Sequence, residues 1–179
     1  MTEKKNIIVI DLDGTLIPFD SFRMLVLMNI FDLRIILLIF IRILRLISNA
    51  SFKYKFIKIL EKKDWEYKNS GIFIDKIIMQ IDNAVMQKIK SNSISDDDII
   101  LCSASPDIYV SKIASRLGWR GYGSFDKEKN TKHLYGKNKK DFIIKNFPPE
   151  KYNYKYSISD SKSDKDLLNM FNSWELIKR

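Results

Sequence analysis

The chain has 179 residues, enough for one domain with a modest insertion, and its 45% hydrophobic and 30% charged residues exclude a disordered chain. Its formal net charge of +9 favours anionic partners, such as phosphorylated metabolites, anionic lipid headgroups or nucleic acid. A general composition bias toward Lys, Asn and Ile would produce the same excess without selection on charge.

The first predicted element is a short β-branched strand over residues 7–10, and no signal-peptide pattern precedes it. We therefore expect a reducing, cytoplasmic location. The strand ends in Asp11-Leu12-Asp13-Gly14-Thr15, which places polar groups at its carboxyl end. The stretch 21–90 then has a helical pattern with few breakers before Gly71. We interpret this stretch as a cap inserted between the first strand and the rest of a sheet.

A second apolar strand is predicted over residues 99–102. The single cysteine, Cys102, excludes an internal disulfide, and its apolar neighbours predict a buried structural residue. Ser103-Ala104-Ser105-Pro106 follows, and then a helix from Asp107 to Leu117, which Gly118 stops. The segment 120–136 is rich in Gly and polar residues and predicts an irregular or hairpin connection.

A third strand is predicted over residues 155–159, followed by Asp160-Ser161-Lys162-Ser163-Asp164 and a helix through Leu167 and Met170. Residues 174–177 suit a last strand. Three strands thus carry polar clusters at their carboxyl ends, where open parallel α/β sheets bind ligands. We predict a Rossmann-like three-layer α/β/α fold with a parallel sheet. Its core would span 1–20 and 91–179, and an α-helical cap would span 21–90.

The strongest chemical signal is the pair of carboxylates Asp11 and Asp13 directly after the first strand. One carboxylate can attack phosphorus while the other manages protons, and Gly14 permits the tight turn that folds the loop over a phosphate. A calcium loop is excluded by spacing, because Phe22 stands where such a loop needs a glutamate. A plain Asp-rich turn is the alternative.

Four segments together resemble the haloacid dehalogenase-like (HAD) superfamily of phosphatases. Asp-x-Asp-Gly-Thr after an N-terminal strand is similar to the first motif, and Ser103 at a strand end is similar to the second. Gly136-Lys137-Asn138-Lys139 resembles the third motif, and the segment 156–164 resembles the fourth. The motif set and the helical cap are similar to the phosphoserine phosphatase-like branch, which includes bacterial phosphatidylglycerophosphatases with hydrophobic caps.

The resemblance implies covalent phosphoryl chemistry. Asp11 would attack phosphorus and form an aspartyl-phosphate. Asp13 would protonate the leaving oxygen and then activate the hydrolytic water. The implied cofactor is Mg²⁺, held by Asp11, the main-chain carbonyl of Asp13, and Asp160. Ser103 and Lys139 would be catalytic through contacts to the phosphate oxygens. Gly14, Thr15, Ser103, Ala104 and Lys139 would bind substrate, and Asp164 would orient Lys139 or metal-bound waters.

Several of these assignments have alternatives. Ser103 could serve only as a helix cap, and an Asp such as Asp164 suits the first turn of any helix. Lys137 and Lys140 flank Lys139, which we favour because of its Gly-x-x-Lys spacing and because Ile143 would share its helix face. His133 lies among polar residues, and we expect it to be solvated and to have no role.

The segment 22–47 is the most apolar part of the chain, but five charged residues interrupt it, which argues against a membrane span. Two interpretations stay open for it. The segment either forms the core of the cap or lies as an amphipathic hairpin in a membrane interface. Residues 21–68 hold ten Lys and Arg against four Asp and Glu, which suits anionic lipid.

Three functions follow from these observations. The first is a Mg²⁺-dependent phosphomonoesterase for a lipid-linked or amphiphilic phosphate, associated peripherally with the inner face of the cell membrane. The second is a soluble phosphatase of small metabolites, similar to phosphoserine phosphatase. The third is a catalytically degenerate, basic membrane-binding module. We expect no nucleic-acid partner, because no familiar nucleic-acid motif interleaves basic and aromatic residues.

Overall fold

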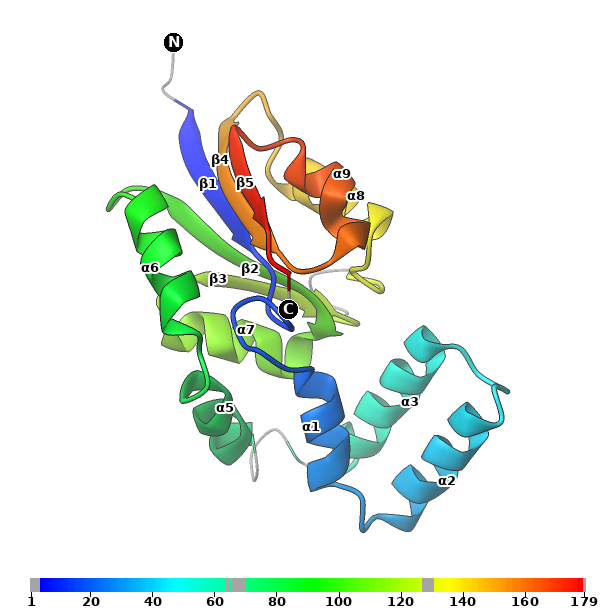
Figure 1. Cartoon of the computed structure of the whole chain (residues 1–179). Coiled ribbons are helices and arrows are strands. Elements are labelled where there is room, and N and C mark those ends of the chain that lie inside the picture. Colours follow the sequence, from blue (N-terminus) through cyan, green and yellow to red (C-terminus); the bar gives the residue numbers. More distant parts are fainter. Residues whose placement is uncertain (1–3, 64, 66–69, 127–130, 179) are drawn as a thin grey trace.

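The computed structural model describes residues 4–63, 65, 70–126 and 131–178. Its centre is a sheet of five parallel strands in the order β3-β2-β1-β4-β5 (Figure 1). The parallel α/β sheet predicted from the sequence is therefore confirmed. The strands are β1 (Lys5–Ile10), β2 (Asp98–Pro106), β3 (Arg120–Ser124), β4 (Tyr152–Ser159) and β5 (Ser173–Leu176).

Helices cover both faces of the sheet and complete the predicted three layers (Figure 1). Along β1, Ile8 and Ile10 join one core cluster and Ile7 and Val9 join the other, because successive strand residues point to opposite faces. Burial on both faces explains why this strand is apolar at consecutive positions. One helical layer contains α6 (Asn83–Asn92) and α7 (Asp107–Arg116), and α5 (Ser70–Ile78) packs on α7. The other layer contains α8 (Lys137–Asn146), η1 (Lys162–Asp164) and α9 (Lys165–Leu168).

Three further helices between β1 and β2 extend away from the sheet (Figure 1). They are α1 (Ser21–Met28), α2 (Leu33–Ile43) and α3 (Asn49–Glu61). The side chains of Asp20, Asp32 and Ser48 cap their N-termini by accepting main-chain hydrogen bonds. Within the described part of the chain, none of the helices has the length and apolar character needed to span a bilayer.

The helix α6 lies beside the sheet rather than with α1 to α3. Its Val85 and Ile89 belong to the same core cluster as the β1 residues, and Lys88 forms an ion pair with Glu175 of β5. The division of the chain into a core and a cap of residues 21–90 stays a prediction. These contacts indicate that any independent cap would centre on α1 to α3.

Two local predictions were wrong. The expected irregular connection at 120–136 begins instead with the strand β3; residues 127–130 of that stretch lie outside the described residues. The strand carries no apolar run, because α7 packs so closely that a Cβ atom on Gly121 would lie 2.6 Å from the Cα atom of Ser111. The helix expected to run through Met170 ends at Leu168.

The close approach of α7 to β3 can be tested by adding one methyl group. Gly121→Ala should lower the free energy of unfolding by about 1–3 kcal/mol, because the new atom meets a backbone that cannot move aside cheaply. Gly71→Ala is the matched control, since within the described part of the chain no atom outside its own helix lies within 4 Å of its Cβ position. Urea denaturation measures both, and equal effects would contradict the proposed packing.

Candidate active site

The carboxyl ends of β1, β2 and β4 bring three remote segments to one edge of the sheet. β1 lies between β2 and β4, so the strand order reverses beside β1, and open parallel sheets form a ligand-binding crevice at such a point. A cleft of about 840 Å³ occupies this position. This cleft is lined by all but one of the site residues that we predicted from sequence. The lining members are Asp11, Asp13, Gly14, Ser103, Ala104, Lys139, Asp160 and Asp164. The exception, Thr15, is fully buried.

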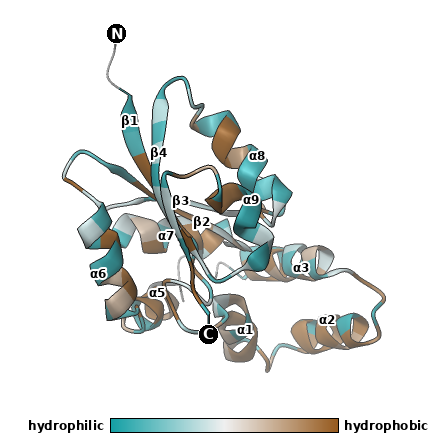
Figure 2. Cartoon of the chain, turned by 45° about the horizontal axis from the view of Figure 1, so that its top comes forward, coloured by the Kyte–Doolittle hydropathy of each residue, from teal (hydrophilic) through white to brown (hydrophobic). Residues whose placement is uncertain are grey.

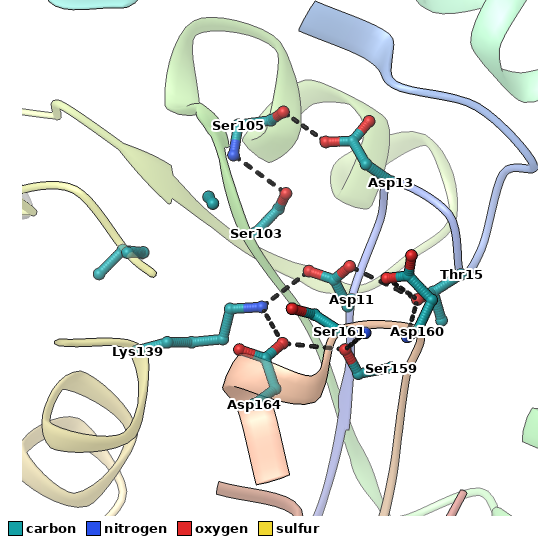
Figure 3. Close-up of polar contacts among 12 residues, drawn as sticks. Asp11, Asp13, Thr15, Ser103, Ser105, Lys139, Ser159, Asp160, Ser161 and Asp164 are labelled. Atoms are coloured by element: carbon teal, nitrogen blue, oxygen red, sulfur yellow. Dashed lines mark hydrogen bonds and ion pairs between the residues drawn. The ribbon is translucent and has the colours of Figure 1, made fainter. Parts of the chain in front are cut away.

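The centre of the site is a buried lysine between two carboxylates (Figure 3). The Nζ atom of Lys139 lies 2.7 Å from Oδ1 of Asp11 and 2.6 Å from Oδ2 of Asp164. Ser159 donates a further hydrogen bond of 2.9 Å to Oδ2 of Asp164. Lys139 lies in the first turn of α8 and shares its buried face with Ile143, as the helical spacing indicated. Lys137 is exposed, so the geometry favours Lys139 over this neighbour.

Burial and charge act in opposite directions on this group of side chains. Burial raises the pKa of Asp11 to about 7, against the attraction of Lys139, which lowers it. Burial of Lys139 favours the neutral amine, but the negative charges of Asp11 and Asp164 outweigh that effect and raise the pKa of the lysine. Lys139 is therefore a permanent positive charge in a place that water hardly reaches.

The second carboxylate, Asp13, is held by its own hydrogen bonds, which do not involve Lys139. Its Oδ1 atom accepts a hydrogen bond of 2.6 Å from the main-chain N–H of Ser21, and the hydroxyl of Ser105 donates to Oδ2. Burial raises the pKa of Asp13, and the two serines oppose that rise. Ser105 also donates its main-chain N–H to Oγ of Ser103, at 3.1 Å. No pattern in the sequence indicated that Ser105 would hold Asp13, because the two residues meet only in the folded chain.

The position of the Asp160 side chain depends on Gly14 and Thr15, in the loop after β1. Gly14 has a φ angle of +70°, and a Cβ atom there would lie 2.1 Å from Oδ2 of Asp160. The main-chain N–H of Asp160 donates a 2.8 Å hydrogen bond to Oγ1 of Thr15. The same hydroxyl lies 3.4 Å from Oδ2 of Asp11 and 3.3 Å from Oδ1 of Asp160. Thr15 thus holds the two carboxylates on either side of one oxygen atom.

The donor set at this edge is chemically suited to a hard cation. Asp11 and Asp160 supply carboxylate oxygens, and the carbonyl of Asp13 belongs to the same loop. Across the described ranges, no three His, Cys, Asp or Glu side chains gather as a metal-binding group. A cation held here would therefore depend on two carboxylates, a main-chain oxygen and ligands from water or substrate, which is a common arrangement for Mg²⁺.

Lys53 of α3 reaches the site from outside the sheet. Its Nζ atom donates a 3.2 Å hydrogen bond to the carbonyl of Ala104 and lies 5.3 Å from the centre of the Phe22 ring. Burial lowers the pKa of Lys53, while the nearby carboxylates Asp13 and Asp20 oppose that shift. The sequence offered no signal that separates Lys53 from the other lysines of this stretch.

The prediction that His133 is solvated was wrong, whereas its lack of a role stays a prediction. The ring is half-buried and lines the cleft, and it stacks between Phe125 and Tyr135 with ring centres 5.8 and 5.7 Å away. Burial, followed by the charge of Lys53, lowers the pKa of His133. Its sequence neighbours are polar, and the aromatic partners that bury it could be recognised only in the folded chain.

Comparison with solved structures identifies the fold. The chain aligns with a HAD-family hydrolase from Salmonella enterica serovar Typhi at a TM-score of 0.61 and 11% identity, over 97% of this chain and 64% of that one. This chain has the HAD fold. A Bordetella pertussis Tohama I protein of unknown function aligns at a TM-score of 0.70 and 15% identity, over 96% and 89% of the two chains.

Among further neighbours with the HAD fold, a phosphoserine phosphatase, solved as an analogue of its phospho-aspartyl intermediate, aligns at a TM-score of 0.50 and 16% identity. The alignment covers 96% of this chain and 86% of the neighbour. No protein-family model matches the sequence, and a search of curated proteins gives no significant match. The likeness therefore lies in the fold, which is the fold that the four sequence motifs imply.

The central ion pairs make Lys139 a test of the site's electrostatics. Lys139→Met should lower the free energy of unfolding by about 3–5 kcal/mol, because it leaves Asp11 and Asp164 buried without a counter-charge. Lys137→Met, at an exposed position in the same helical turn, should change it by less than about 0.5 kcal/mol. Chemical denaturation at neutral pH measures the difference. Similar losses in both variants would show that the buried pairs do not stabilise the fold.

Proposed function

We propose that this chain is a phosphatase that hydrolyses phosphomonoesters through a covalent intermediate on Asp11. The observation that carries the proposal is the buried ammonium of Lys139 between Asp11 and Asp164, at the floor of a cleft that Asp13 and Ser103 also line. The acidic nucleophile and the acid–base group follow β1, whereas the fixed positive charge comes from α8, and no simpler structural role requires all of them at one place.

In the first step, a carboxylate oxygen of Asp11 attacks phosphorus, and the bond from phosphorus to the ester oxygen breaks. Lys139 is bound to Oδ1 of Asp11, and the Thr15 hydroxyl is near Oδ2, so the carboxylate is held in one orientation before substrate arrives. This orientation reduces the entropic cost of the attack. The product is an aspartyl-phosphate and a free alkoxide oxygen that requires a proton.

Asp13 supplies that proton. Burial raises its pKa, which makes the protonated form more accessible than for an exposed aspartate, and Ser21 and Ser105 hold its carboxyl group in place. In the second step, the ionised Asp13 takes a proton from water. The water oxygen attacks phosphorus, the bond to Asp11 breaks, and inorganic phosphate is released with both aspartates restored.

Lys139 and Ser103 would bind the oxygens of the transferring phosphoryl group. A fixed positive charge in a buried place stabilises developing negative charge more strongly than the same charge in water. Asp164 fixes the position of the Lys139 ammonium and contacts no reacting atom in this scheme.

Asp11, Asp160 and the main-chain carbonyl of Asp13 would hold Mg²⁺, as proposed from the oxygen ligands at this edge. When bound, the ion would reduce the repulsion between the Asp11 carboxylate and the anionic phosphate. Thr15 keeps Asp11 and Asp160 together for that purpose, and Gly14 leaves the space that the Asp160 carboxylate needs.

The cleft wall contributed by α1 to α3 supports an amphiphilic substrate. Its polar part includes Lys53 and Arg42, and its apolar part includes the rings of Phe22 and Phe52. A phosphate ester with an apolar or aromatic group beside the phosphate would contact both. A small polar metabolite would use the cations but would make no contact with the apolar part of the wall, which makes it the less favoured substrate class.

The covalent step can be tested with a chromogenic phosphate ester. Asp11→Asn should lower kcat by at least about a thousandfold, because an amide cannot form the acyl-phosphate. EDTA should abolish wild-type hydrolysis, and added Mg²⁺ should restore it. Asp141→Asn, an exposed position on α8, is the matched control and should keep full activity. Equal, metal-independent rates in wild type and Asp11→Asn would leave only the degenerate binding module.

Lys53 tests the cleft wall independently. Lys53→Met should raise KM for an anionic ester by about tenfold with a smaller change in kcat, because the removed charge acts mainly in binding. Lys55→Met, an exposed neighbour on α3, should leave both constants unchanged. Steady-state kinetics of the wild type and the two variants measures whether the effect is specific to Lys53. An equal effect of both substitutions would indicate a general loss of positive charge rather than a contact in the cleft.

A further inference from the structure

The outer side of α2 carries a continuous apolar surface that no part of the described chain covers. Its residues are spaced three and four apart, so they form one stripe on the helix. Every member has at least 46% of its surface exposed. The α2 stripe consists of Leu33, Ile36, Leu37, Phe40, Ile43 and Leu44.

The stripe is separate from the face that α2 uses for folding. Ile35 and Leu38, on the opposite side of the helix, are buried in the core cluster, and α2 packs there against α3. Arg42 also points away from the stripe and lines the cleft. Figure 2 shows α2 as a strongly hydrophobic helix at the edge of the molecule. The fold is therefore complete without the stripe, which remains available for a partner.

The chain on both sides of α2 continues the apolar surface. Phe31, just before the helix, is 94% exposed, and Leu46, just after it, is 69% exposed. Full exposure of a phenylalanine beside six other exposed apolar residues is unusual for a surface that faces only water, and a contiguous patch of this kind marks an interaction site.

The charge around the stripe indicates what the partner is. Residues 21–68 hold ten Lys and Arg against four Asp and Glu. Asp32, at the start of α2, forms ion pairs with both Arg34 and Lys63, so the local net charge is positive even beside this acid. Arg45, at the other end of the helix, is exposed. A second copy of the chain would bring two positively charged rims together, whereas an anionic bilayer offers both apolar depth and opposite charge.

We propose that the α2 stripe docks on the surface of an anionic lipid bilayer, with α2 lying in the interfacial plane. Its apolar side enters the boundary between headgroups and acyl chains, and the flanking arginines and lysines contact lipid phosphates. Because Arg42 lies on the other side of the same helix, docking places the wall of the cleft next to the bilayer. The docking surface does not include the catalytic residues, so docking does not depend on the proposed reaction.

Vesicle flotation of the full chain tests the proposal at low ionic strength. The wild type should float with vesicles of phosphatidylglycerol and phosphatidylcholine and should float at least about tenfold less with phosphatidylcholine alone. Leu33→Ser/Phe40→Ser should lower the bound fraction on anionic vesicles by about tenfold or more. The matched control, Ile72→Ser/Met79→Ser, removes two exposed apolar residues on and after α5 and should bind as the wild type does.

Two further measurements make each outcome decisive. Thermal unfolding of the α2 variant should match the wild type, since the altered residues are exposed. Asp11→Asn should float as the wild type does, which separates a failure of docking from a failure of the proposed chemistry. Absence of wild-type flotation on anionic vesicles would overturn the proposal. So would sedimentation that shows a dimer dissociated by Leu33→Ser/Phe40→Ser, because a second copy would then occupy the stripe.

Discussion

The structure depends most on one buried ammonium group. Lys139 comes from α8, Asp11 from the end of β1, and Asp164 from η1 beyond β4, so the two ion pairs connect elements that are far apart in sequence. None of these charges could be buried alone, because desolvation of an isolated ion costs several kcal/mol. Each charge is buried beside an opposite charge of the other elements, and the group that they form is the one suited to phosphoryl chemistry.

The loop after β1 connects this charged group with the helices outside the sheet. It contains Asp13, which is held by Ser21 at the start of α1 and by Ser105 at the end of β2. The position of α1 is therefore set partly by a catalytic candidate. From the same group of helices, Lys53 reaches the carbonyl of Ala104. A substrate in the cleft would contact both the sheet and the helices, and α2 would separate it from the surface on which we propose that the protein docks.

The sequence predicted the elements whose pattern is local. An apolar run followed by two aspartates and a glycine indicated β1 and its loop, and Gly-x-x-Lys spacing identified the lysine that the fold buries. It failed at β3, whose glycines satisfy the close packing of α7 rather than any strand pattern. It failed also at His133, whose polar neighbours in sequence differ from its aromatic neighbours in space.

The sequence by itself determined the parallel α/β sheet, the sites at its strand ends and the order of the candidate catalytic residues, because periodicity and turn residues act over a few positions. Only the tertiary structure decided that Ser105 holds Asp13, that Lys53 enters the cleft and which side of α2 is left uncovered. These outcomes depend on how helices pack against the sheet. Packing is set by the shape and charge of residues far apart in the chain, which no local pattern records.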